Sequence, residues 1–300
     1  MSNMFRNLFI FVFTVWRYGK IGIINMNLSR LKKELKKVAD PKRAKASQRY
    51  FKTGKGEYGE GDVFLGITVP QSRKIAIKFK NLDFSSIETL LHSRIHEGRL
   101  IALLILVKKF EKESESERER IFDFYLKNTK YINNWDLVDL SAHKIIGGYL
   151  LSRGPVKSNP SVLRQGFGTA QPANAALSLE ASKRSGVGIP SSFATPFVLL
   201  RLAKSKNIWE RRIAVLSTFQ FIKYNRFNES LIIAKILLND KHDLIHKAVG
   251  WMLREVGKKN LYVELKFLNK HYKKMPRTML CYSIEKFPEK LRRIYLSKQI

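Results

Sequence analysis

Apolar residues recur every three or four positions along most of the chain, with lysine, arginine and other polar residues between them. This is the period of an amphipathic helix. The first clear case begins at Met26 and places Leu28, Leu31 and Leu35 on one face, and Asp40-Pro41 ends it. No stretch alternates between apolar and polar residues as a half-buried strand does. The pattern therefore predicts an all-α protein, with further helices or helix starts at 42–51, 69–70, 83–110, 121–126, 135–151, 208–222, 231–238, 244–256 and 261–272.

The predicted helices and their polar turns group into units of roughly 35 to 45 residues, the size of the unit in helical-repeat proteins. Such units stack as pairs of helices and form an α-solenoid. The units share little sequence with one another, so we infer this architecture from helix lengths and not from self-similarity.

Two segments depart from the helical pattern. The apolar run at 8–16 is shorter than the roughly 20 residues that span a bilayer, and Trp16-Arg17-Tyr18 follows where a signal peptide would have small residues. We expect residues 1–25 to be an N-terminal extension outside the fold, either an upstream extension of the reading frame or a weak membrane-facing tail. Residues 154–196 are rich in proline, glycine, serine and alanine. We expect a disordered surface insertion or a foreign insert in the reading frame there, which in either case loops out of a domain that spans residues 26–300.

Charge adds a partner to this picture. The chain has 56 Lys and Arg against 25 Asp and Glu, a formal net charge of +31. An excess of this size favours a polyanion as the partner, and nucleic acid is the first candidate. A basic protein that charge merely keeps soluble is the alternative. A single cysteine, Cys281, excludes a disulfide framework and a cysteine-rich metal site, and it fits a reducing compartment.

The segment Asn134–Asp139 carries the first candidate chemistry. Asn134 is a good N-cap for the helix that follows, and Trp135 and Asp139 then lie one turn apart on the same face. An indole beside a carboxylate favours a cationic ligand, because the ring face attracts positive charge. A core tryptophan, with Asp139 bonded to a neighbouring helix end, is the alternative.

Two later segments combine tryptophan with basic residues. In the helix that begins near Asn207, Arg212 is expected at the border of the apolar stripe, where its planar guanidinium can bind a phosphate or form a surface salt bridge. In the segment 243–259, Trp251 is expected at the edge of the apolar face, beside Lys247 and Arg254. Trp251 can contact a sugar or a base there, or it can anchor the core.

No motif indicates a metal or a cofactor. Two histidine pairs, His92/His96 and His242/His246, have a spacing that can bind zinc, but no HExxH sequence is present and no carboxylate or cysteine completes either pair. Walker A, GxGxxG and GxSxG sequences are also missing. We therefore expect neither a metal nor a cofactor.

Taken together, these segments resemble the AlkD-type DNA alkylation repair glycosylases, a family of HEAT-like repeat DNA glycosylases. The resemblance covers about 26–287 outside the insertion, and it depends on four stretches: 64–73, 134–139, 208–216 and 247–255. It implies a superhelix of HEAT-like repeats whose concave, basic face holds duplex DNA. It also implies hydrolysis of the N-glycosidic bond of cationic N3- or N7-alkylated purines.

The resemblance also implies roles for individual residues. Trp135, Asp139 and Trp251 match the family's catalytic residues, and Arg212 matches its DNA-binding arginine. Tyr50 and Arg73 match positions near the DNA, and we expect Lys247 and Arg254 to contact DNA as well. One departure concerns the stretch before Pro70, which often carries polar side chains towards DNA in the family. Here Thr68-Val69 offers one hydroxyl.

The chemistry of the substrate fits these roles. An alkylated purine is already cationic, so it leaves without a general acid, and catalysis consists of stabilising a positive sugar and placing a water. We expect a monomer in the cytoplasm, associated with the nucleoid in a prokaryote and with no stable membrane attachment. A non-catalytic HEAT-like DNA-binding protein and a solenoid that binds an acidic protein are the alternatives.

Overall fold

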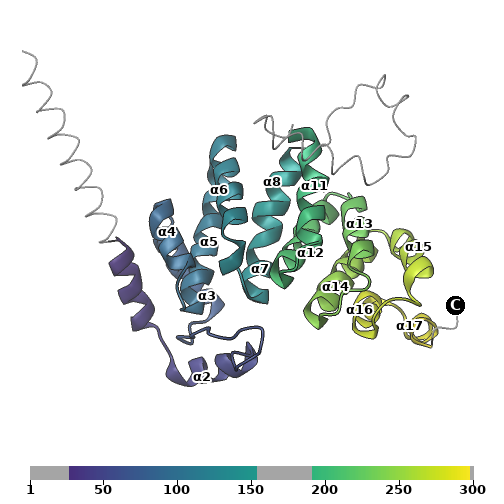
Figure 1. The fold of residues 1–300 in the computed structure, drawn as a ribbon, viewed down its shortest axis with the longest axis horizontal. Coiled ribbons are helices and arrows are strands. Elements are labelled where there is room, and N and C mark those ends of the chain that lie inside the picture. The colour runs from purple at the N-terminus through teal and green to yellow at the C-terminus, as the bar shows by residue number, and fades with distance from the viewer. Residues whose placement is uncertain (1–26, 154–190, 298–300) are drawn as a thin grey trace, which may run out of the picture. The chain divides into compact units, whose positions relative to one another are not determined.

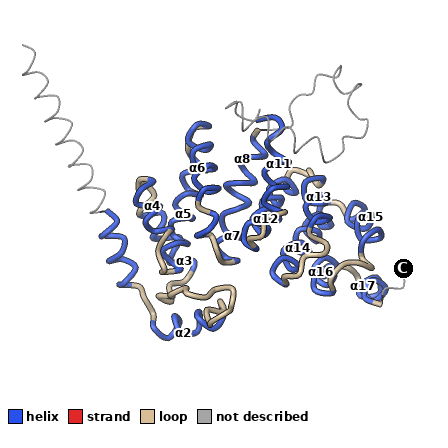
Figure 2. The backbone as a smooth tube through the Cα atoms, viewed as in Figure 1, coloured by secondary structure: helices blue, strands red, loops and turns tan. Residues whose placement is uncertain are grey.

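The computed structural model of the 300-residue chain describes residues 27–153 and 191–297 (Figure 1). Within these two ranges the secondary structure is helical, and the single β-type contact is an isolated bridge between Val63 and Ile95. Figure 2 shows helices joined by loops along both ranges. The prediction of an all-α fold is confirmed.

The described residues form two compact units that divide between Ser141 and Ala142. The division falls inside a continuous helical stretch, because α7 (Trp135–Ala142) is followed directly by the π-helical turn η2 (His143–Gly147) and by α8 (Gly148–Ser152). Each unit has its own buried core and is described by itself below.

The first unit is built around α5 (His96–Lys112), which is buried on most of its sides. A helix that is apolar on all sides belongs in a core, and α5 packs against α3 and α4 and contacts α6. The unit also contains a helix at residues 27–37 and a 3₁₀ turn, η1, before α7. The bounds of its other helices are α2 (Pro41–Tyr50), α3 (Val69–Lys78), α4 (Phe84–Leu91), α6 (Glu115–Lys127) and η1 (Thr129–Tyr131).

Local signals fix where these helices begin. Asp40 caps α2 through a bond from the Arg43 N–H, and Asp83 caps α4 through a bond from the Ser86 N–H. Thr68 begins α3 with a complete capping box. The prediction of a single helix over 83–110 is wrong: α4 ends at Leu91, and α5 begins only at His96. The break occurs because the Val63 segment pairs with residues 94–96 through backbone hydrogen bonds.

The second unit is organised around α12 (Ile208–Lys223) and α14 (Asp243–Lys259). Helix α12 packs against η2, α11, α13 and α14, and α14 packs in turn against α15 and α16. Figure 1 shows α11 to α14 side by side in green. The bounds of the other elements are α11 (Ser191–Ala203), α13 (Asn228–Ile236), α15 (Leu261–His271), α16 (Arg277–Ser283), η3 (Ile284–Lys286) and α17 (Glu289–Leu296).

The two segments that depart from the helical pattern lie largely outside the described residues. The predicted extension at 1–25 and residues 154–190 of the predicted insertion are not among them. Helix α11 begins at Ser191, so it starts inside the range 154–196 that the sequence assigns to the insertion. In the described part of the chain, no helix has the length and apolar character that crossing a bilayer requires.

Candidate functional site

The start of α7 carries the tryptophan and the carboxylate that the sequence singles out. The Asn134 side chain accepts a hydrogen bond from the Trp135 N–H at 2.8 Å, the first N–H of α7, whereas an N-cap residue accepts from the second or third. Trp135 and Asp139 follow one turn apart, and both are half-buried. Asp139 also lies near the buried Tyr125: burial raises the pKa of the Tyr125 phenol, and the Asp139 charge raises it further. Tyr125 therefore remains neutral, with its hydroxyl 2.9 Å from the Ser141 hydroxyl.

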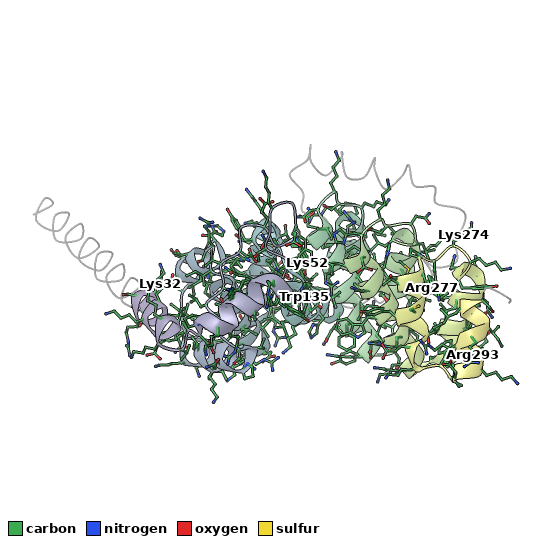
Figure 3. The ribbon with its side chains drawn as sticks, turned by 90° about the horizontal axis from the view of Figure 1, so that it is seen from below. Lys32, Lys52, Trp135, Lys274, Arg277 and Arg293 are labelled. Carbon is green, nitrogen blue, oxygen red and sulfur yellow. The ribbon has the colours of Figure 1, made fainter. Side chains whose placement is uncertain are left out.

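Trp135 belongs to a column of aromatic rings. The Phe51 ring stacks on Trp135 with centroids 5.0 Å apart and planes 11° apart, and Phe64 stacks on Phe51 at 4.9 Å. Tyr50, which is 68% exposed, meets the edge of Trp135 at 5.9 Å. The structure therefore brings together Tyr50 and Trp135, two predicted site residues from helices that are far apart in sequence. Trp135 is labelled in Figure 3.

A buried cluster of charged residues lies next to this column. Asp62, His96, Arg99 and Asp136 each have at most 7% of their surface exposed. His96 lies between the two carboxylates, 3.0 Å from Asp62 and 2.8 Å from Asp136, and the Arg99 guanidinium donates to Asp62 at 2.6 Å. Burial alone would lower the pKa of His96, but the bonds to Asp136 and Asp62 outweigh it and raise the pKa to about 9. The cluster ties the loop at Asp62 and the start of α7 to the start of α5.

The loop between Asp62 and α3 is held by an acid of α5. The Glu97 carboxylate accepts hydrogen bonds from the backbone N–H groups of Leu65, Gly66 and Ile67 at 2.8–3.1 Å. Gly66 has φ +78°, and a Cβ there would overlap the Asp40 carbonyl oxygen, so the tight approach of this loop to the start of α2 requires glycine.

Helix α3 follows the loop and carries the predicted DNA contacts of this region. The Thr68 hydroxyl, the one polar group that the sequence offers before Pro70, donates to the Gln71 side chain at 2.7 Å and so belongs to the capping box. Arg73 lies on the exposed face of α3. Of these two groups, Arg73 is therefore the more accessible to a ligand.

In the second unit, aromatic and basic side chains gather where α12 and α14 pack together. Trp251 of α14 is half-buried, its ring centroid is 6.2 Å from Phe219, and its indole N–H donates to Glu255 at 3.1 Å. Lys223 lies over the Phe219 ring at 4.7 Å, and His143 meets the ring's edge at 5.6 Å. Burial and the nearby Lys144 lower the pKa of Lys223. This aromatic–cationic cluster suits a ligand with both rings and negative charge.

A comparison with protein families identifies the family of this chain. A family model described as "DNA alkylation repair enzyme" matches residues 31–164 and 195–287. The chain belongs to the DNA alkylation repair enzyme family. Among solved structures, it is similar to a predicted DNA alkylation repair enzyme from Enterococcus faecalis, with 15% identity and a TM-score of 0.56, over 84% of this chain and 97% of that one. This likeness supports the helical fold. No curated protein matches the chain.

Family membership gives the chain a role in DNA repair, and the structure locates each residue that the sequence proposed for that role. Tyr50, Arg73, Trp135 and Asp139 lie in the first unit, whereas Arg212, Lys247, Trp251 and Arg254 lie in the second. Within the first unit, Tyr50 contacts Trp135. Arg73 lies apart from this ring contact, on the exposed face of α3.

The basic residues of the second unit have intramolecular partners. Arg212 is only 5% exposed and donates to the Leu244 carbonyl at 2.5 Å, so it lies deeper than the border position that the periodicity of α12 predicts. Lys247 pairs with Asp243 at 2.7 Å, and Arg254 pairs with Glu285. A phosphate that binds these side chains would compete with those carboxylates.

The four histidines with zinc-like spacing have partners of other kinds. His92 bonds to Asn128 and stacks on Tyr131, and His242 accepts from the Leu244 N–H. Across the described ranges, no group of three or more His, Cys, Asp or Glu side chains could hold a metal ion.

Sequence reasoning missed the buried charge cluster. The available signal was His96-Glu97-Gly98-Arg99, a segment with three ionisable residues immediately before the apolar run of α5. Since a helix of that composition is buried on all sides, charged residues in its first turn require buried partners. The identity of those partners, Asp62 and Asp136, depends on tertiary structure.

Proposed function

We propose that this chain is a DNA glycosylase that hydrolyses the N-glycosidic bond of cationic N3- or N7-alkylated purines in duplex DNA. The observation that carries the proposal is the start of α7 in a chain of the DNA alkylation repair family. There an indole and a carboxylate stand one turn apart on a rigid helix, and both keep part of their surface accessible. This pair suits a ligand that is cationic or becomes so.

The proposed chemistry needs little beyond that pair. The alkylated base carries a positive charge and leaves without a proton donor, so the sugar becomes an oxocarbenium-like cation. Asp139 stabilises that charge and positions the attacking water. Trp135 contacts the deoxyribose, with Tyr50 beside it, and Trp251 of the second unit contacts the lesion strand.

DNA binding is the second part of the proposal. The helices form a superhelix of HEAT-like repeats with a concave, basic face, and Arg212, Arg73, Lys247 and Arg254 contact phosphates. The net charge of +31 and the aromatic–cationic cluster at Phe219 support a nucleic-acid partner. Because the chemistry occurs on a base that is already activated, the proposal requires no metal and no cofactor.

The decisive experiment measures base release from a duplex that contains N7-methylguanine. We expect Asp139→Asn to slow single-turnover release by about 10²–10³-fold, since an electrostatic stabiliser of this type is worth about that factor. The amide keeps the size of the side chain, so duplex affinity is expected to stay within about twofold of the wild-type value. Asp123→Asn, which removes an exposed carboxylate of α6, is the matched control and should release base at the wild-type rate.

The same assay tests the alternative functions. If wild type and Asp139→Asn both bind the duplex but neither releases base above the spontaneous rate, the protein is a non-catalytic DNA-binding protein. If it binds polyglutamate as tightly as DNA, it is a solenoid for acidic partners. Either result contradicts the glycosylase proposal.

A further inference from the structure

The hydrogen bonds of His96 define its charge. Its Nδ1 is 3.0 Å from an Asp62 oxygen and its Nε2 is 2.8 Å from an Asp136 oxygen. A carboxylate only accepts hydrogen bonds, and a neutral imidazole has one N–H. Both contacts can be hydrogen bonds only if both ring nitrogens carry a proton. His96 is therefore an imidazolium in this arrangement.

The surroundings of His96 balance that charge. Asp62 faces it from the loop and Asp136 from the start of α7, while Arg99 of its own helix binds the same oxygen of Asp62. Asn134 also donates to Asp62, at 3.4 Å. Two cations and two carboxylates thus share one buried site. Burying the cations without the carboxylates, or the carboxylates without the cations, would be costly.

Two routes connect His96 to the indole of Trp135. The first route is through the backbone, because Asp136, which binds His96, directly follows Trp135 in the chain. The Asp136 carboxylate also accepts a hydrogen bond from the Leu137 N–H at 2.8 Å in the first turn of α7. The second is through rings: His96 lies 5.1 Å from Phe51, which stacks on Trp135. The Phe64 ring also stacks on the His96 ring, with centroids 4.4 Å apart. Aromatic rings as well as carboxylates therefore hold the imidazolium in place.

We propose that His96 is a positioning residue for Trp135, and that its imidazolium sets where the indole lies by joining the Asp62 loop to the start of α7. The effect of this positioning on catalysis rests on the proposed function. The positioning of Trp135 by His96 does not depend on that function. His96 does not itself touch the reacting atoms. It acts through Asp136 and Phe51.

Loss of the His96 proton has a definite consequence. The ring then keeps one N–H, so one of the two carboxylates loses its donor inside the protein. The link between the loop and α7 is broken on one side, and Trp135 is free to shift relative to Phe51 and Tyr50. A histidine that only fills space would not couple its protonation to the indole.

The test follows the indole N–H signal of Trp135 by NMR as the pH rises from 7 to 10, with the signal assigned through Trp135→Phe. We expect it to move with a midpoint near the His96 pKa of about 9. Tyr50 touches the same ring and carries a phenol group, so the titration is repeated in Tyr50→Phe. The signals of Trp209 and Trp251, in the second unit, serve as internal references.

Three variants complete the experiment. His96→Gln should abolish the movement and slow N7-methylguanine release at pH 7.5 by about 10–100-fold, because misplacing a contact residue by about 1 Å has an effect of that size. Asp136→Asn removes one of the carboxylates that raise the pKa of His96. The midpoint of the Trp135 signal in this variant should therefore fall by about one pH unit or more. His92→Gln makes the same substitution at an exposed histidine four residues earlier, after the end of α4, and it should change neither readout.

The outcomes separate this proposal from the proposed function. If the Trp135 signal does not follow pH in the wild type, or follows it equally in His96→Gln, the positioning role is wrong. If the signal follows His96 but even the wild-type protein releases no base, the positioning role stands and the glycosylase proposal fails. Because the wild-type titration does not depend on His96→Gln, a folding defect in that variant leaves the proposal testable.

Discussion

Glu264 is a buried acid that forms no ion pair with the residues that the structure describes. It is 1% exposed, and in the described part of the chain its Oε1 atom has no hydrogen-bond partner. Its carboxyl group lies against the backbone of Gly257, where a Cβ would overlap it. Burial raises the pKa of Glu264 to about 8, and the Arg254 charge opposes this only in part. The folded protein therefore holds a proton that the unfolded chain releases near its ordinary pKa of 4.5.

This proton makes stability depend on pH. Since the folded-state pKa is the higher one, the contribution of Glu264 to the free energy of unfolding should fall as the pH rises from about 4.5 to about 8 and level off above that. Glu264→Gln keeps the shape without the charge, so it should be more stable than wild type by a few kcal/mol at pH 9 and similar to it at pH 5. Urea unfolding at both pH values measures this difference.

Glu285 of the same unit is the matched control. It is exposed, and the pKa of its carboxyl is lowered by a hydrogen bond from Lys286 and by the Arg254 charge. Glu285→Gln should therefore give a small loss of stability that does not grow between pH 5 and pH 9. A difference between Glu264→Gln and wild type that is the same at both pH values would contradict the role of the Glu264 proton.

At the residue scale, the sequence predicts contacts between residues that are close in the chain, but it does not predict contacts between residues that are far apart in the chain. Trp135 and Asp139 share a face because four residues make about one helical turn, and this follows from the sequence alone. The partners of His96 are 34 and 40 residues away. Likewise, the periodicity of α12 places Arg212 at the border of an apolar stripe, but the helices packed around α12 bury it.

At the scale of the elements, helices with strong periodicity and a capping residue are predicted well. The prediction for 208–222 matches α12 (Ile208–Lys223) within one residue at its end, and Asn207 caps it through the Trp209 N–H. The short helices α16 and α17 were not predicted. Each begins directly after a proline, Pro276 or Pro288, which is a recognised helix-start signal. Their apolar faces are too short for periodicity to reveal.

Gly250 lies where α14 and α16 approach each other closely. A Cβ at Gly250 would overlap the Met279 carbonyl oxygen of α16. Gly250→Ala should therefore force α14 and α16 apart and reduce the free energy of unfolding by about 1–3 kcal/mol. Thermal or urea unfolding measures the loss.

Gly98 of α5 provides the control for that substitution. A Cβ there would meet the Ser93 side chain at 3.7 Å, an ordinary van der Waals distance. Gly98→Ala should be neutral or stabilising, because alanine favours a helix over glycine by up to about 1 kcal/mol. If Gly250→Ala is as stable as Gly98→Ala, the close approach of α14 and α16 is not what requires glycine.

At the scale of the whole molecule, positive charge occurs in both units. Lys32 and Lys52 belong to the first, and Lys274, Arg277 and Arg293 belong to the second (Figure 3). All five side chains are exposed. With a net charge of +31, binding to duplex DNA should be dominated by the release of counterions from phosphates. This part of the function follows from composition, whereas the arrangement of the charges does not.

The strength of that effect can be measured through salt. If the protein neutralises about 6–10 phosphates, its affinity for a duplex should fall by about 10³–10⁵-fold between 50 and 200 mM salt. Fluorescence anisotropy with a labelled duplex measures it, and polyglutamate is the competitor that separates a DNA-binding surface from general attraction to anions. An affinity that barely changes with salt would contradict a phosphate-binding surface.

Variants on α3 show whether the contacts are specific. Arg73 and Lys74 are adjacent and both exposed, but they point about 100° apart around the helix, so a single DNA backbone does not meet both equally. If Arg73 contacts a phosphate, Arg73→Ala should reduce the slope of log affinity against log salt by about one, with little change for Lys74→Ala. If both variants reduce the slope equally, α3 attracts DNA only through its net positive charge, and Arg73 does not contact a specific phosphate. Because each substitution removes one positive charge from neighbouring positions, the long-range field changes alike in both, and a difference between them reports a local contact.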